Sequence, residues 1–335
     1  MASVSDAAVP APPPPALRPV AMALAGGLAM VFASTALLVA AYHAPRAKGL
    51  DVAVVGSPAQ AALVQTRLDA ASRGAFDVRP YATAEAARAA LLATRVHGVL
   101  TVDPTGVHAV VAGASGAAPT ELVVTAARGL AGAGHAPLRV EDAAPLPAAD
   151  RRGLSSLFTM VGTLIPSLVF GALLSVVGGA LPARIRWGAL LLYAVLAGLL
   201  VAFTVDVVVG ALNGHMAGIA MVTGLLALAV AAAAHGLGHL RGPAGIALAV
   251  VAMVPLGLSS SGGALTYPLE PGFYGAISQL LPPGAALTAV RNVAYFDWAA
   301  TRAPLLVLAA WAAGGFVLGL LGERFGPSSA AASAA

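Results

Sequence analysis

Cysteine is absent from this chain, and lysine occurs once among its 335 residues, as Lys48. The absence of cysteine excludes disulfide bonds, thiolate metal ligands and a cysteine nucleophile. A phosphate-binding loop needs the pattern G-x-x-x-x-G-K-[ST], and Lys48 precedes the first expected strand without those glycines. The chain therefore has no ATP site of this kind, and if ATP energises the protein, another polypeptide must bind it.

Charged and aromatic residues are also scarce. They make up 10% and 5% of the chain, whereas roughly 25% of the residues of a soluble domain are charged. The formal net charge of +4 reflects a small excess of arginine without a basic run, so we expect no nucleic-acid partner. No G-x-G-x-x-G pattern follows an expected strand, and we expect no cofactor.

Long apolar runs are the main feature that is present. Hydrophobic residues make up 59% of the chain, and the mean hydropathy is +0.87. A helix needs about 20 apolar residues to cross the hydrocarbon core of a bilayer. The pattern predicts a polytopic α-helical protein with six spanning helices, multi-pass in the plasma membrane and surrounded by the lipid bilayer. The runs are Val20–Tyr42, Leu154–Leu181, Trp187–Ala211, Met216–Leu237, Pro243–Leu258 and Pro304–Leu321.

The first run has a competing interpretation as a cleaved signal peptide, because Val39-Ala40-Ala41 resembles a cleavage site. Signal peptides have shorter apolar regions, of about 7–15 residues, and a more basic start than the single Arg18 found here. A retained anchor is the favoured interpretation.

Most charges lie between the first and second runs, in residues 44–153. Short apolar segments alternate there with helix signals, such as the N-cap and first-turn proline of Ser57-Pro58. Asp103-Pro104-Thr105-Gly106 has the composition of a hairpin turn. The order predicts an external α/β domain inserted between spanning helices 1 and 2. Its expected strands are Leu50–Val55, Phe76–Tyr81, Gly98–Val102, Val107–Val111 and Leu138–Val140, with helices beginning near Ser57, Thr83 and Pro119.

Arginines in the short loops predict the orientation, because such residues stay on the cytoplasmic side. Arg18, Arg184, Arg186, Arg241 and Arg324 share one side, which places both termini in the cytoplasm and residues 44–153 outside. The predicted organisation is a disordered cytoplasmic tail (1–19), a transmembrane anchor (20–43), an extracytoplasmic α/β domain (44–153), a five-helix membrane domain (154–322) with an outer re-entrant hairpin (262–303), and a cytoplasmic tail (323–335).

Three stretches carry a resemblance to a known family: Ala84–Thr101, Val107–Leu130, and Leu281-Pro282-Pro283-Gly284 through Arg291–Phe296. With the order of anchor, α/β domain and five further helices, they resemble the type-2 ABC permease group. The closer likeness is to its phage-infection-protein-like (YhgE/Pip-like) single-domain relatives. The resemblance implies a permease-like component of an export system, energised by a separate cytoplasmic ATPase subunit and working as a homodimer.

One departure from that group keeps an alternative open. Type-2 permeases carry a coupling helix between the second and third spans, but here the joint is only Pro182–Arg186. The alternative is a non-transporting envelope protein whose external domain acts as a receptor or scaffold. If an ATPase does bind, Arg184 and Arg186 occupy the coupling position and are the candidate partner contacts.

Within the spanning runs, Asp206 is the one acidic residue. It is either a polar group on a translocation path or an interfacial carboxylate close to Asn213, since charges inside a membrane are costly. His235 and His239 have metal-compatible spacing without an acidic partner, which fits better with a helix end. An intramembrane serine protease at Ser259-Ser260 would need a histidine base within hydrogen-bond reach of the serine. In the rhomboid pattern this base comes from a later helix, and no histidine follows His239. We therefore expect no enzyme, and no residue identifies a substrate.

Overall fold

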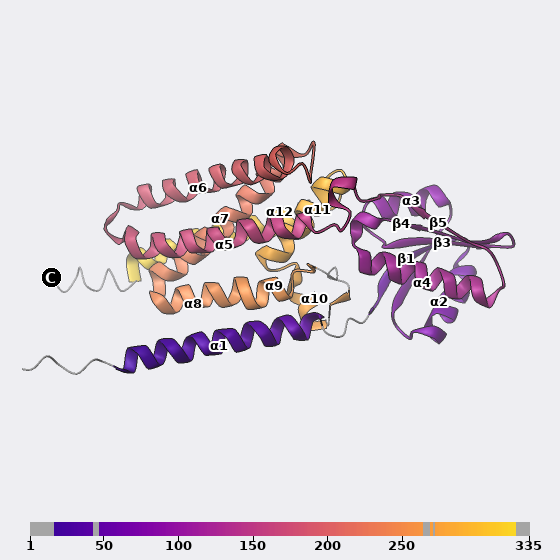
Figure 1. Ribbon diagram of the computed structural model, residues 1–335, viewed down its shortest axis with the longest axis horizontal. Helices are drawn as coiled ribbons and strands as arrows, with labels where there is room; N and C mark the ends of the chain where they lie inside the picture. Colours follow the sequence, from indigo (N-terminus) through magenta and orange to yellow (C-terminus); the bar gives the residue numbers. More distant parts are fainter. Residues whose placement is uncertain (1–16, 43–46, 264–268, 271, 326–335) are drawn as a thin grey trace, which may run out of the picture.

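The computed structural model describes residues 17–42, 47–263, 269–270 and 272–325, and most of these residues are helical. An α/β unit (residues 47–153) occupies one end of the molecule and a bundle of long helices the other (Figure 1). The start of the first helix and the end of the last both lie at the end of the bundle remote from the α/β unit, which we call the distal end (Figure 1). The predicted tails lie mostly outside the described residues, since residues 1–16 and 326–335 are not among them.

The α/β unit contains one five-stranded sheet in the order β2-β1-β3-β4-β5. All neighbours are parallel except β3 and β4, which form the predicted antiparallel hairpin. Alternate side chains face opposite sides: Leu50, Val52 and Val54 pack under α2 and α4, whereas Ala53 packs under α3. The elements are β1 (Leu50–Val55), α2 (Pro58–Ala71), β2 (Phe76–Tyr81), α3 (Ala84–Leu92), β3 (Gly98–Asp103), β4 (Gly106–Val111), α4 (Ala117–Ala133) and β5 (Leu138–Asp142).

Local signals in this unit predicted the elements well. Ser57 forms a capping box with Gln60, in which its hydroxyl accepts the N–H of Gln60 at 3.3 Å. Thr83 caps α3 through the N–H of Ala86, as predicted. The predicted start of the third helix, near Pro119, was wrong by two residues, because α4 begins at Ala117. Pro119 lies within the first turn of α4, where its missing N–H costs no helical hydrogen bond.

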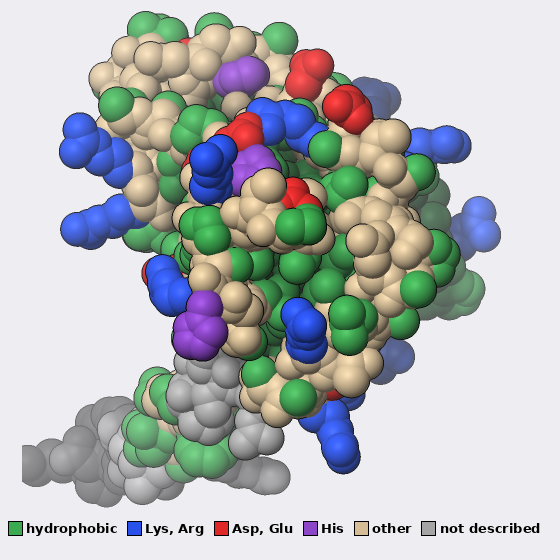
Figure 2. All heavy atoms as spheres, turned by 90° about the vertical axis from the view of Figure 1, so that its right-hand side faces the viewer, with side chains coloured by type: hydrophobic (Ala, Val, Ile, Leu, Met, Phe, Trp, Pro, Cys, Tyr) green, Lys and Arg blue, Asp and Glu red, His purple; other side chains and the backbone are tan. Residues whose placement is uncertain are grey.

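Charged side chains of both signs and histidines are distributed over the end of the molecule formed by the α/β unit (Figure 2). The bundle has the opposite surface, because large apolar side chains such as Leu192, Leu196 and Leu200 on α6 are exposed. A surface of that kind fits the interior of a bilayer.

Five helices are long and apolar enough to cross a membrane. They are α1 (Leu17–Tyr42), α5 (Ser155–Val177), α6 (Ala183–Phe203, continued by the π-helical η4, Thr204–Val208), α7 (Met216–Arg241) and α12 (Arg302–Phe325). A sixth apolar helix, Pro243–Ser259, is shorter and consists of α8 (Pro243–Val251), the π-helical η5 (Ala252–Leu256) and α9 (Gly257–Ser259). The π turn at Pro255 is the local irregularity expected of a proline within a helix.

The helix α7 is central. In the membrane-length segment of α7, 61% of the residues are buried within the protein, whereas only 6% are buried in the corresponding segment of α1. Glycines allow its neighbours to approach closely: a Cβ added at Gly171 on α5 would lie 2.2 Å from the carbonyl oxygen of Ala231. On α12, a Cβ at Gly315 would lie 2.4 Å from the carbonyl carbon of Ala232. Close backbone contact of this kind is how helices associate in lipid.

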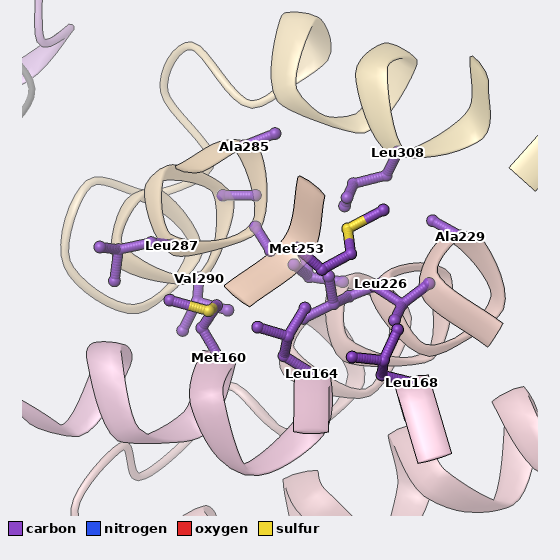
Figure 3. Close-up of a cluster of buried hydrophobic side chains, with 14 of the residues drawn as sticks. Met160, Leu164, Leu168, Leu226, Ala229, Met253, Ala285, Leu287, Val290 and Leu308 are labelled. Atoms are coloured by element: carbon purple, nitrogen blue, oxygen red, sulfur yellow. The ribbon is translucent and has the colours of Figure 1, made fainter. Parts of the chain in front are cut away.

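The core of the bundle combines segments that are far apart in the sequence. Figure 3 shows Met253 between Leu308 of α12 and Leu226 of α7, with Met160, Leu164 and Leu168 of α5 nearby. Ala285, Leu287 and Val290 of α11 (Pro282–Tyr295) complete the cluster.

Residues of the predicted outer hairpin form α10 (Gly272–Ser278) and α11, while residues 264–268 and 271 lie outside the described part of the chain. The sequence predicts two short helices here, Phe273–Leu281 and Ala285–Phe296, separated by Pro282-Pro283-Gly284, and this separation is wrong. These residues form the first turn of α11, because proline is well suited to the first helical position. Most of α11 is buried among α5, α7 and α12.

Candidate functional site

A cavity of about 270 Å³ lies at the junction between the α/β unit and the near end of the bundle. We call it the junction cavity. The α/β unit contributes the end of α3 and the turn before α4, and the bundle contributes α11 and the start of α12. The residues that line it are Leu91, Thr94, Val96, His97, Ser115, Ser261, Gly262, Gln279, Leu287, Thr288, Arg291, Asn292, Phe296, Ala300, Ala303, Pro304 and Val307.

Two side chains fix the α/β unit on this junction. Phe296, directly after α11, is buried in the apolar layer under α3, beside Leu91 and Val99. Leu269 is buried in the opposite layer, which contains α2 and α4. The segment before α12 therefore supplies one side chain to each face of the sheet, and the cavity has walls from both parts of the molecule.

Arg291 is the charged residue of the cavity wall. Its side chain is partly buried, and its Nη1 donates to the carbonyl oxygen of Ser115 at the long distance of 3.5 Å. Among the described residues, no carboxylate oxygen lies within 4.0 Å of its guanidinium. Burial lowers the pKa of Arg291, opposed by Tyr295 and Asp150. Arginine nevertheless stays protonated in proteins, so the cavity contains a positive charge without a direct ion pair.

Asp150 lies close enough to influence Arg291 but is bound elsewhere. Its carboxylate is 6% exposed and accepts the backbone N–H groups of Leu154 and Ser155 at 3.2 and 3.3 Å. It also accepts the hydroxyl of Tyr295 from α11. Burial is the main cause that raises the pKa of Tyr295, and the nearby Asp150 raises it further, so this hydroxyl remains protonated and acts as a donor. Asp150 therefore joins the end of the α/β unit to both α5 and α11.

His97 adds a second polar group to the wall. Its Nδ1 is buried and has no hydrogen-bond partner among the described residues. Burial lowers the pKa of His97, with Asp51 acting in the opposite direction. The ring is therefore neutral at physiological pH and offers one donor and one acceptor.

Positive φ angles concentrate at this junction. Thr94 and Ala300 line the cavity with φ of 56° and 52°, and Asp297 and Trp298 have φ of 46° and 66°. Such backbone conformations are unfavourable for residues other than glycine, particularly for the β-branched Thr94. They cluster where the surrounding structure enforces them, often at binding sites.

Glu270 lies beside the cavity, and its side chain is almost completely buried. Its Oε1 accepts the N–H of Gly262, a cavity residue, at 2.8 Å, whereas Oε2 is buried without a partner among the described residues. Burial raises the pKa of Glu270 to about 7, although the hydrogen bond from Gly262 acts to lower it.

The two candidate partner-contact arginines differ in placement. Both lie in the first turn of α6, which starts at Ala183, so the expected joint Pro182–Arg186 is mostly helix. Arg184 is exposed at the distal end. Arg186 is 5% exposed, pairs with Glu323 of α12 at 2.7 Å and donates to the carbonyl oxygen of Leu181 at 2.6 Å. Glu323, expected to begin the cytoplasmic tail, is within α12.

Asp206 is away from the junction cavity. It lies in the π-helical end of α6, and its Oδ1 accepts the N–H of Gly214 at 2.9 Å. Gly210 and Gly214 have φ of 70° and 84°, which glycine adopts readily, and they form the turn to α7. The described contact of Asp206 is thus with this turn, close to Asn213.

The remaining polar candidates are buried. His235 and His239 stack at 5.5 Å between ring centroids, and Trp187 packs edge-on against His235. The described residues contain no group of three or more His, Cys, Asp or Glu residues that could hold a metal ion. Ser259 and Ser260 are buried, and their hydroxyls donate to the carbonyl oxygens of Pro255 and Leu256 one turn earlier.

The sequence did not single out Arg291, Asp150, Tyr295 or Glu270 as site residues. Arg291 carried a usable signal, because it interrupts an otherwise uncharged segment, Ala285–Phe296, and was expected on the side with few arginines. For Asp150 no local signal exists, since its partner Tyr295 is 145 residues away.

Comparison with known proteins adds no relative. No family model, no curated protein and no solved structure matches this chain. The class that the fold itself defines is a chain with several membrane-length apolar helices and a small mixed α/β sheet, compatible with a multi-pass membrane protein.

Proposed function

We propose that this chain is a six-span protein of the plasma membrane, with residues 44–153 outside and both termini in the cytoplasm. The sixth span is Pro243–Ser259, whose 17 residues extend about 25 Å as a helix, close to the roughly 30 Å of the hydrocarbon core. The distal end carries Arg184, Arg186, Arg241 and Arg324, which supports its assignment to the cytoplasmic side.

Within that topology, the chain acts as a permease-like component of an export system, similar to the type-2 ABC permease group, energised by a separate ATPase. The observation that carries this proposal is the junction cavity. Its walls come jointly from the α/β unit, α11 and the outer start of α12, and it contains the charged Arg291. Concave sites between domains with a few polar groups are where small molecules bind. Such a cavity at the outer end of the bundle is suited to holding a molecule on its way out of the membrane.

Of the two candidate partner-contact arginines, Arg184 is the one available to an ATPase at the distal end, because Arg186 is occupied by Glu323. The exposed apolar surface of α6 is the proposed contact between two copies of the chain in a homodimer.

A receptor or scaffold function has one observation in its favour. The segment between α5 and α6 consists of the short 3-10 helix η3 (Gly178–Ala180), Leu181 and Pro182, so the described joint contains no separate coupling helix. In that case the α/β unit would bind an external partner, and the bundle would hold it at the membrane.

Affinity purification in lipid nanodiscs tests the two functions. A coupled permease should co-purify with an ATPase, whose nucleotide hydrolysis should rise when the chain is present. Arg184→Gln should weaken this association, while Arg241→Gln, a change of the same kind at the other distal joint, should affect it less. Absence of any ATPase from wild-type preparations contradicts the permease and leaves the receptor or scaffold.

A further inference from the structure

We propose that the junction cavity binds a small amphiphile with one anionic headgroup, a carboxylate or a phosphate monoester, through the guanidinium of Arg291. The inference rests on the proposed function, since it names the chemical class of the molecule that this cavity would hold. It is tested by binding alone, without an ATPase.

The charge of the cavity selects an anion. None of the described lining residues is acidic, and within the described part of the chain the hydrogen bond of Arg291 is the long contact to the Ser115 carbonyl. Asp150 is the carboxylate whose charge acts on Arg291. It already accepts two backbone N–H groups and the Tyr295 hydroxyl. A partly buried guanidinium with unused donors is a favourable partner for a carboxylate or phosphate, which it can bind through two parallel hydrogen bonds.

Neutral polar groups surround the charge. Asn292 follows Arg291 on α11, and Thr288 lies one turn before it on the same helix. His97 faces the same cavity from the α/β unit with a buried, unpartnered Nδ1 atom. These groups can complete the hydrogen bonds of a headgroup, and because they are neutral they leave the preference of the cavity for an anion unchanged.

The rest of the wall is apolar and selects a hydrocarbon body. Leu91 and Val96 come from the α/β unit, Leu287 and Phe296 from the α11 segment, and Val307 from α12. A freely soluble ion would leave this surface unused, whereas an alkyl chain would bury its CH₂ groups against it and remove apolar surface from water.

The size limits the molecule. At about 30 Å³ for each water in the liquid, 270 Å³ corresponds to roughly nine waters, which is room for a headgroup with a short alkyl chain. Such a group could be a free alkyl acid or the end of an anionic lipid that enters from the bilayer. Both present the same chemistry to Arg291.

The test measures binding of radiolabelled octanoate to the full chain in nanodiscs of zwitterionic lipid. Octyl phosphate should compete with it, whereas octanol and octylamine should compete at least tenfold more weakly. Arg291→Gln should lower the affinity at least tenfold, because it removes the charged donor of the hydrogen bonds to the headgroup. Arg291→Lys should keep part of the affinity, since it retains the charge but loses the planar fork.

Two further variants distinguish loss of the binding site from a general effect of substitution on octanoate affinity. Arg302→Gln removes an exposed arginine at the start of α12 that does not line the cavity, and its octanoate affinity should equal wild type. Ala303→Phe fills the cavity from an exposed position while keeping Arg291, and it should weaken binding. If Arg291→Gln does not fold, as judged by gel filtration and thermal unfolding, the competitor series and Ala303→Phe still decide the outcome.

Discs that contain phosphatidic acid, an anionic lipid whose headgroup is a phosphate monoester, identify the source of the ligand. Loss of octanoate binding in these discs assigns the cavity to a lipid headgroup, and unchanged binding assigns it to a free acid. Equal affinity of wild type and Arg291→Gln, or equal competition by octylamine, overturns the inference. If octanoate does not bind while an ATPase still co-purifies, only the ligand class is wrong; if it binds without any ATPase partner, only the energised permease is wrong.

Discussion

The hydroxyl of Tyr295 in α11 donates a hydrogen bond to the carboxylate of Asp150, a residue near the C-terminal end of the α/β unit. The same carboxylate caps the start of α5 through the N–H groups of Leu154 and Ser155. One buried acid thus fixes the α/β unit to two helices, and it does so next to Arg291 without pairing with it. This arrangement leaves the positive charge of the cavity open to a ligand.

Removing the Tyr295 hydroxyl should loosen this junction. Tyr295→Phe should lower the free energy of unfolding by about 1.5–3 kcal/mol, because the lost bond involves a charged, buried acceptor. Trypsin should also cleave faster at the exposed Arg151 and Arg152. Thermal unfolding and timed proteolysis measure both effects. Tyr81→Phe, in the sheet, is the matched control, and an equal response of the two variants would contradict the assigned role.

Glu270 should make stability depend on pH. Its pKa is raised by burial from 4.5 to about 7, so the unfolded chain loses this proton at lower pH than the folded protein. The contribution of Glu270 to the free energy of unfolding should therefore be largest below about pH 4.5 and should fall by about 3 kcal/mol as pH rises to about 7, with no further loss above that. Chemical denaturation between pH 4 and 8.5 measures this change. Glu270→Gln should remove this part of the pH dependence, whereas Glu121→Gln on the surface of α4 should preserve it.

Adjacent glycines on α12 should respond oppositely to alanine. A Cβ at Gly315 would meet the Ala232 backbone at 2.4 Å, whereas nothing lies within 4 Å of one at Gly314. Gly315→Ala should destabilise the bundle by about 1–3 kcal/mol, the usual cost of overpacking. Gly314→Ala should be neutral or slightly stabilising, because alanine favours the helix. Thermal unfolding in matched detergent compares them, and equal melting temperatures would rule out the close α7–α12 contact.

Arg186 and Glu323 should behave as a coupled pair. Arg186→Gln should cost about 3 kcal/mol, near the lower end for a broken buried pair because Glu323 is partly exposed. Adding Glu323→Gln should recover part of this loss, and the double-mutant cycle gives the coupling energy. Arg184→Gln should change stability by less than about 0.5 kcal/mol, as expected for a surface residue. A strictly additive double mutant would show that the pair does not stabilise the fold.

The proposed topology can be tested with single cysteines, since the chain has none of its own. Ser72→Cys in the α/β unit and Gly179→Cys in the α5–α6 joint are both at exposed positions. An impermeant maleimide should label Ser72→Cys on intact cells and Gly179→Cys only after permeabilisation. The reverse pattern would place the α/β unit in the cytoplasm.

Local sequence signals were sufficient for the secondary structure. Alternating apolar residues and caps such as Ser57 and Thr83 act over a few positions, so the five strands and their helices were predicted closely. Apolar runs likewise predicted the long helices, although α5 ends at Val177 and α6 begins at Ala183, both earlier than expected. Those boundaries depend on contacts such as that of Arg186 with Glu323, which are not local.

The candidate site was predictable only in small part. Arg184 and Arg186 look equivalent in the sequence, but burial separates them, because Arg186 points toward a carboxylate 137 residues away. Asp206 was expected either on a translocation path or close to Asn213, and its carboxylate accepts the N–H of Gly214, the residue after Asn213.

What the sequence determined by itself was the alternation of apolar and polar segments, and hence which parts form membrane-length helices and which form a sheet. This follows because hydrophobic periodicity and capping depend on neighbours within one or two turns. Tertiary structure decided the junction: Phe296 and Leu269 anchor the two faces of the sheet, Asp150 is bound by Tyr295, and Arg291 has no ion pair among the described residues. These features are contacts between segments that are distant in the sequence. Such contacts form only when all the helices of the bundle are packed closely together.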